Sequence, residues 1–81
     1  MNKNKKTYLD ILSGTKDRNM RFSDVRNLLD AMGFKCSING DHYIFRMPNT
    51  PIINMQSANG KAKRYQIAQL RKILLQNGLE V

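Results

Sequence analysis

The stretch that decides the fold is Ile38-Asn39-Gly40-Asp41-His42-Tyr43-Ile44-Phe45. Asn-Gly between two runs of alternating apolar and polar residues is the strongest short-range signal for a β-hairpin with a two-residue turn. With Asn39-Gly40 as that turn, we predict strands over residues 34–38 and 41–47. Ile38 is then expected opposite Asp41, at the rim of the sheet, and Cys36 opposite Tyr43.

The predicted hairpin is amphipathic. Residues opposite each other on paired strands share a face, because side chains alternate along each strand. One face is expected to meet the core, and it holds Phe34, Cys36, Ile38, Tyr43, Phe45 and Met47. The other face is polar and holds Lys35, Ser37, His42, Ile44 and Arg46. The only histidine of the chain is therefore expected on the solvent side, flanked by Lys35 and Arg46.

Two helices are predicted before the hairpin. Residues 1–6 form a basic, frayed arm, after which Thr7 begins a helix of about two turns that Gly14 ends. Ser23 is a good N-cap for a second helix, and Gly33 is expected to end it in the left-handed conformation. The apolar stripe of this second helix is Val25, Leu28, Leu29 and Met32, at the spacing of one helix face.

A third strand and a closing helix follow the hairpin. Residues 52–56 are expected to pair with the second strand, with Phe45 opposite Ile53, Tyr43 opposite Met55 and Gln56 beside His42. Ser57-Ala58-Asn59-Gly60 is interpreted as the break after this strand. The final helix begins near a basic cluster and ends at Gly78, and its apolar stripe is Ile67, Leu70, Ile73 and Leu74. The predicted class is α+β, a three-stranded antiparallel sheet with helices packed on one face, in one domain over residues 1–81.

Composition narrows the function. The chain carries 14 Lys and Arg against 6 Asp and Glu, a formal charge of +8 on 81 residues. Such a surplus favours a polyanionic partner, and nucleic acid ranks above an acidic protein and well above a membrane surface. No apolar run approaches the ~20 residues that span a bilayer, and no signal-peptide core follows the basic start, so we expect a cytoplasmic protein. A single Cys36 and a single His42 exclude an internal disulfide and a structural zinc site.

Three stretches carry a resemblance to a known family. They are Arg21–Leu29 with Met32-Gly33-Phe34, then Asn39–Phe45 with its Gly-x-His, and finally Ile53–Gln56 leading to Lys61–Lys63, Tyr65–Ile67 and Leu70–Leu74. In order, spacing and length the chain resembles the HicA (YcfA-like) toxins of bacterial type II toxin–antitoxin systems. The resemblance implies a fold like the double-stranded-RNA-binding domain and a metal-independent messenger-RNA interferase without a cofactor. It also implies a HicB-type antitoxin protein as partner.

The motif around the histidine is Gly40-Asp41-His42, and Asp41 stands where many members of the family carry Ser. An imidazole exchanges a proton near neutral pH, and RNA supplies its own nucleophile, the 2′-OH. We therefore expect His42 to act as general base or acid, with Lys35 and Arg46 holding the phosphate. The alternative is that His42 is an ordinary surface histidine.

Lys61, Lys63 and Arg64 are expected to bind RNA phosphates at the start of the closing helix, as lysines do at that place in double-stranded-RNA-binding domains. The alternative is that they form only a solvated charged face. Tyr65 is compatible with either packing or base stacking. Three functions stay open at this point: a metal-independent endoribonuclease, a non-catalytic RNA-binding module, and a structural basic protein.

Overall fold

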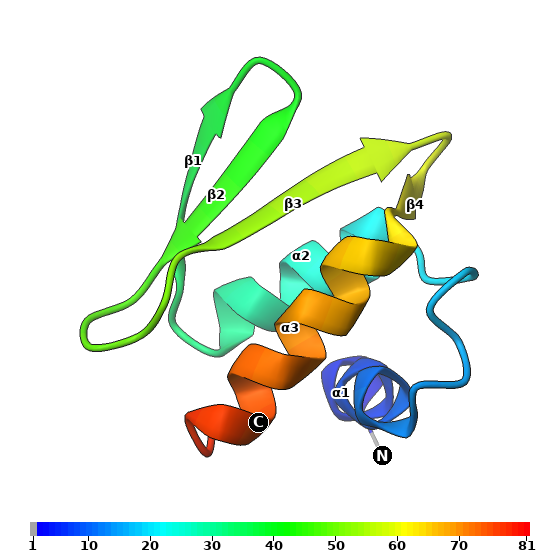
Figure 1. The fold of residues 1–81 in the computed structure, drawn as a ribbon, viewed down its shortest axis with the longest axis horizontal. Helices are drawn as coiled ribbons and strands as arrows, with labels where there is room; N and C mark the ends of the chain where they lie inside the picture. The colour runs from blue at the N-terminus through cyan, green and yellow to red at the C-terminus, as the bar shows by residue number, and fades with distance from the viewer. Residues whose placement is uncertain (1) are drawn as a thin grey trace.

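The computed structural model describes residues 2–81, which form three helices and one four-stranded antiparallel sheet (Figure 1). The elements in chain order are α1 (Lys3–Ser13), α2 (Phe22–Ala31), β1 (Lys35–Asn39), β2 (His42–Arg46), β3 (Ile53–Ala58), β4 (Lys61–Ala62) and α3 (Arg64–Gln76). The strands lie in the sheet in the order β1-β2-β3-β4. The α+β class is therefore confirmed.

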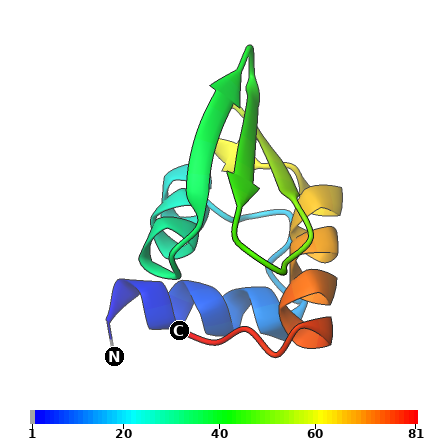
Figure 2. The same cartoon turned by 90° about the vertical axis from the view of Figure 1, so that its left-hand side faces the viewer.

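The helices form a layer under one side of the sheet. Figure 2 shows α1 across the base, with α2 and α3 standing to either side and the β1–β2 hairpin projecting away from them. The core between the layers holds the apolar stripes that the spacing predicted, with Leu28, Phe45, Ile67 and Leu70 at most 1% exposed. The outer face of the hairpin is left uncovered by helices, as a half-solvated antiparallel sheet allows.

The helix ends at glycine are confirmed. Gly14, Gly33 and Gly78 all take positive φ angles, of 71°, 100° and 61°. After Gly33, the N–H of Phe34 donates to the carbonyl of Leu29 at 3.1 Å, and Phe34 is buried. This is the left-handed helix ending that places the following apolar residue back on the helix.

The predicted hairpin turn is wrong by one position. The two turn residues are Gly40 and Asp41, and the pairs are Asn39 with His42, Ile38 with Tyr43, and Cys36 with Phe45. Gly40 has φ of 64°, which suits a two-residue turn that places glycine first. The register changes by two residues, which is the repeat of side-chain direction, so the assignment of residues to the two faces is unaffected.

Both predicted helix starts are wrong. The arm over residues 1–6 is helical from Lys3, because the side chain of Asn2 caps the helix by accepting from the N–H of Lys5 at 2.7 Å. Thr7 is consequently buried inside α1 instead of capping it. Helix α2 begins at Phe22, ahead of Ser23, because the extended residue Arg21 pairs with Lys61 of β4.

The sheet has a fourth strand that the sequence analysis did not predict. Asn59 and Gly60, with φ of 55° and 82°, form a tight turn between Ala58 and Lys61, which are paired. Two consecutive positive φ angles at Asn-Gly are typical of a type I′ hairpin turn. The predicted break over Ser57-Ala58-Asn59-Gly60 is therefore wrong: Ser57 and Ala58 extend β3, and Asn59-Gly60 reverses the chain into β4. The phosphate-binding candidate Lys61 lies on this strand and not in the helix.

Candidate functional site

His42 begins β2 at the base of the hairpin turn, on the outer face. Its side chain is 45% exposed, so the ring faces solvent and not the helix layer. Its neighbour across the ladder is Gln56 of β3, as predicted. The outward ring results from strand alternation, because Tyr43 and Phe45 occupy the inward positions.

Both ring nitrogens of His42 lie beside an oxygen. Nδ1 is 3.2 Å from Oδ1 of Asn54, and Nε2 is 3.6 Å from Oδ1 of Asp41. An amide oxygen can only accept, so Nδ1 carries the proton in its contact with Asn54. When the ring is protonated, Nδ1 donates to Asn54 and the ring's positive charge lies 3.6 Å from Oδ1 of Asp41; when the ring is neutral, Nε2 has a free lone pair. Nε2 is thus the nitrogen available for proton transfer.

A chain of polar contacts runs from this ring into the helix layer. Asp41, whose carboxylate is largely exposed, accepts from Nε2 of Gln56 at 3.4 Å. Gln56 is buried and is bound by Gln66 of α3, whose Oε1 accepts from the Gln56 backbone N–H at 2.6 Å and whose Nε2 donates to Gln56 Oε1 at 3.0 Å. Buried polar groups fully paired in this way hold a single arrangement. The position opposite His42 is therefore anchored from α3.

The predicted cations of the hairpin share the face of His42 but lie at its other end. Lys35 pairs directly with Arg46, at the end of the β1–β2 ladder remote from the turn. Four residues along a strand separate Arg46 from His42, about 13 Å. Arg46 leans back along the face and donates to Oγ of Ser37 at 3.0 Å. The backbones of both residues are therefore remote from His42, while the guanidinium of Arg46 reaches back to Ser37, two residues from the Asn39 that pairs with His42.

The second predicted cluster approaches the ring from β4 and α3. The N–H of Lys63 donates to the carbonyl of Gln56 at 3.3 Å, which puts the Lys63 backbone about 10 Å, two strand widths, from His42. Lys61 shares the outer face with Gln56, because its partner Ala58 lies two residues along β3. Arg64 is the exposed first residue of α3.

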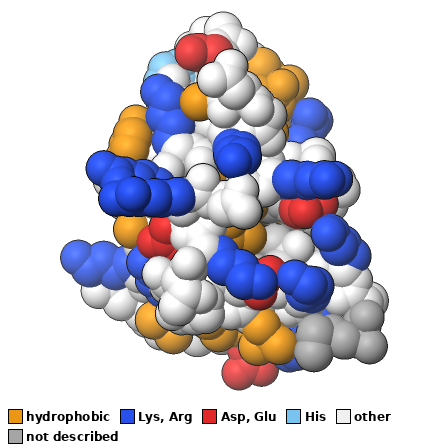
Figure 3. Space-filling view, turned by 90° about the vertical axis from the view of Figure 1, so that its right-hand side faces the viewer, with side chains coloured by type: hydrophobic (Ala, Val, Ile, Leu, Met, Phe, Trp, Pro, Cys, Tyr) orange, Lys and Arg blue, Asp and Glu red, His pale blue; other side chains and the backbone are white. Residues whose placement is uncertain are grey.

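Figure 3 shows the surface that these elements share with α1 and the loop between α1 and α2. Lys and Arg side chains are spread over this face and outnumber the acidic side chains interspersed among them, and the histidine is visible at its upper edge. A surface of this sign raises the local concentration of polyanions and speeds their association.

Asn54 and Gln66 were missed by the sequence analysis. The signal for Asn54 was present: the predicted pairing of Phe45 with Ile53 already places Asn54 on the outer face, diagonal to His42. No sequence signal marks Gln66, because its burial depends on how α3 docks against the end of β3.

Within residues 2–81, no three His, Cys, Asp or Glu side chains converge as ligands for a metal ion. No helix in the same range is long and apolar enough to cross a membrane. Comparisons of the chain with protein-family models, curated proteins and solved structures gave no significant match.

Proposed function

We propose that the protein is a metal-independent endoribonuclease that cleaves messenger RNA, with His42 as the proton-transfer residue. The single observation that carries the proposal is the outward imidazole, held at Nδ1 by Asn54 with Nε2 toward solvent and Asp41. The positive charge of the chain and its resemblance to HicA toxins support the choice of RNA.

The chemistry needs only proton transfer and charge stabilisation. The 2′ oxygen of RNA attacks the adjacent phosphorus, the bond from phosphorus to the 5′ oxygen breaks, and the products end in a 2′,3′-cyclic phosphate and a 5′-hydroxyl. Neutral His42 accepts the 2′-OH proton at Nε2, or protonated His42 donates from Nε2 to the departing 5′ oxygen; water exchanges the other proton. We expect Lys61, Lys63 and Arg46 to neutralise the phosphate, because the Lys63 backbone binds Gln56 and the Arg46 guanidinium reaches back along the face to Ser37.

The biological setting follows as part of the same proposal. A toxin of a type II toxin–antitoxin system would act in the cytoplasm and be neutralised by a HicB-type antitoxin. The uncovered outer face of the hairpin, with His42 on it, is the surface that such a protein would cover.

A non-catalytic RNA-binding module is the second candidate. It is favoured by the position of Asp41, whose carboxylate lies beside Nε2 where a phosphate would have to approach.

The test is incubation of the purified protein with end-labelled messenger RNA in EDTA, beside His42→Ala and a Lys72→Ala control on the exposed side of α3. We expect cleavage that leaves cyclic phosphate ends, a loss of about 100-fold or more in His42→Ala, and no loss in the control. Cleavage by His42→Ala at the rate of the unchanged protein overturns the assignment. Binding without cleavage selects the second candidate.

A further inference from the structure

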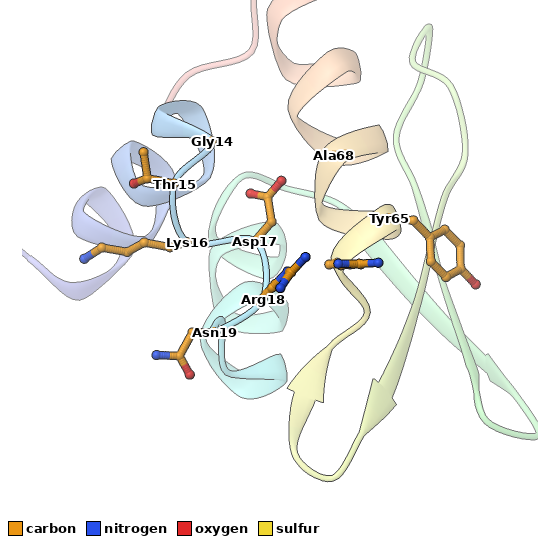
Figure 4. A pocket seen from close by; sticks show the side chains of 9 residues that line it. Gly14, Thr15, Lys16, Asp17, Arg18, Asn19, Tyr65 and Ala68 are labelled. Carbon is orange, nitrogen blue, oxygen red and sulfur yellow. The ribbon is translucent and has the colours of Figure 1, made fainter.

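An open groove lies between the loop that joins α1 to α2 and the first turns of α3 (Figure 4). Its volume is about 500 Å³, and its lining includes Lys16, Asp17, Arg18 and Asn19 from the loop with Arg64 and Tyr65 from the helix. None of the loop residues was a candidate in the sequence analysis. The groove is separate from the outer face of the hairpin, on which His42 lies.

The charge of the groove is positive. Asp17 is its only carboxylate, and both of its oxygens accept hydrogen bonds of 2.9 Å from Arg71 on α3. A carboxylate paired through two parallel bonds to Arg is neutralised in place. Nζ of Lys16 lies 3.4 Å from Oδ1 of Asp10, a carboxylate that also pairs with Lys6. Arg18 and Arg64 make no ion pair within the described residues.

The groove also has an exposed aromatic ring. Tyr65 is 54% exposed, although Tyr8 is buried and Tyr43 packs against the core. Figure 4 shows its ring projecting from the first turn of α3 on the side away from the loop, while Arg18 points from the loop toward the opposite side of that turn. An exposed aromatic face and unpaired guanidinium groups on the lining of one groove form the combination that binds single-stranded nucleic acid, because the base stacks and the phosphate meets the cations.

The groove and His42 are linked by the backbone. Gln66 follows Tyr65 directly and binds Gln56, the residue opposite His42 in the sheet. An RNA strand at His42 therefore has to pass only the first turn of α3 to reach Tyr65. The loop side of the groove is held in place by the Asp17–Arg71 pair, so the cations are positioned before RNA binds.

We propose that this groove binds a nucleotide of single-stranded RNA flanking the cleavage site, with its base stacked on Tyr65 and a phosphate between Arg18 and Arg64. The inference rests on the proposed function for the identity of the polymer. Unpaired bases are required, because a base in a duplex has no free face to stack on a side chain.

The test measures binding separately from cleavage. A short fluorescein-labelled oligouridine is titrated with the His42→Ala protein, and the affinity is followed by anisotropy. Tyr65→Leu should weaken binding about ten-fold or more, and Tyr65→Phe, which keeps the ring, should bind as the parent does. Arg18→Gln should weaken binding and reduce the slope of log affinity against log salt by about one, and Lys72→Gln should do neither. Thermal melting confirms that each exposed substitution leaves the fold intact.

Equal affinity of Tyr65→Leu and Tyr65→Phe for oligouridine overturns the inference. The same titrations are made with a fluorescein-labelled RNA duplex, and the inference is also overturned if Tyr65→Leu loses as much affinity for the duplex as for oligouridine. Failure of this inference can be distinguished from failure of the proposed function. If binding depends on Tyr65 but the unchanged protein does not cleave RNA, the nuclease proposal is rejected and the groove proposal is kept. If the protein cleaves RNA and Tyr65 has no effect on binding, the groove proposal is rejected and the nuclease proposal is kept.

Discussion

Gln66 binds Gln56 at two points, accepting from its backbone N–H at 2.6 Å and donating to its side-chain oxygen at 3.0 Å. These bonds fasten the first turn of α3 to the residue opposite His42. Helix docking and the geometry of the candidate site are therefore coupled through one buried amide pair.

Replacement of Gln66 should destabilise the protein. Gln66→Leu leaves the Gln56 N–H and amide oxygen buried without a partner, which costs about 1–3 kcal/mol. The measurement is the free energy of unfolding from urea titration. Gln69→Leu, on the exposed side of the same helix, should stay within about 0.5 kcal/mol of the parent. Equal stability of the two variants would show that the amide pair contributes nothing.

Asn54 should position the ring of His42. Asn54→Leu removes the acceptor at Nδ1, so the ring loses its orientation and RNA cleavage should fall about five- to ten-fold. Asn54→Asp keeps an oxygen at the same place and should recover most of the rate. The comparison is made on cleavage rate at saturating RNA, with binding measured in parallel. A rate unaffected by Asn54→Leu would remove this residue from the site.

The carboxylate of Asp41 should oppose the approach of phosphate. Two like charges about 4 Å apart in water repel by about 1 kcal/mol, so Asp41→Ser should tighten RNA binding roughly five-fold at low salt. Asp41→Asn, which keeps an acceptor for Gln56, should give a similar gain. The gain should shrink as salt is raised. If binding weakens instead, Asp41 supports substrate binding through His42.

The Asp17–Arg71 pair should stabilise the fold by fastening the loop between α1 and α2 to α3. Arg71 donates to both oxygens of Asp17 and to the carbonyl of Ile11, and both charged side chains are about one-fifth exposed. The hydrogen bonds to Asp17 hold the pKa of Arg71 above its ordinary value. Arg71→Met should cost about 1–3 kcal/mol, measured by thermal unfolding. A double-mutant cycle with Asp17→Asn should show coupling above about 0.5 kcal/mol, and simple additivity would contradict the assignment.

Asp10 should make the protein slightly less stable in acid. The hydrogen bond from Lys6, at 2.9 Å, holds the pKa of Asp10 below its ordinary value, with further help from Lys16. A lowered folded-state pKa means that the carboxylate stabilises the fold above the unfolded pKa, and that this contribution disappears as pH falls through the folded-state pKa. Asp10→Asn should therefore be less stable at neutral pH, by under about 1 kcal/mol, and equal to the parent in strong acid. Urea titrations at several pH values measure the difference.

The spacing of apolar residues along the chain predicted the features that depend only on the local repeat of a helix or strand. The buried faces of α2 and α3, the two faces of the hairpin and the outward position of His42 all follow from spacings of 3.6 and 2 residues. They persist even though the turn was misplaced, because a register change of two residues preserves side-chain direction. Glycines 14, 33 and 78 likewise mark helix ends through their own freedom at positive φ.

Turn chemistry was ambiguous because the chain offers the same dipeptide twice near the sheet. Asn39-Gly40 was assigned the tight turn, but it is Asn59-Gly60 that takes positive φ at both positions and starts β4. The two sites differ in what surrounds them. Arg21 and Met20 lie alongside β4, where Ala62 donates to Met20 at 2.9 Å, and these long-range partners stabilise a strand of only two residues.

The sequence by itself determined which residues are inside, which face carries His42, and the positive charge, because these depend only on residue type and local repeat. Tertiary structure alone decided that Lys63 lies beside Gln56, that Gln66 anchors Gln56 opposite the ring, and that Arg18 and Tyr65 line one groove. Those contacts unite segments far apart in the chain, and their geometry depends on how the helices dock under the sheet.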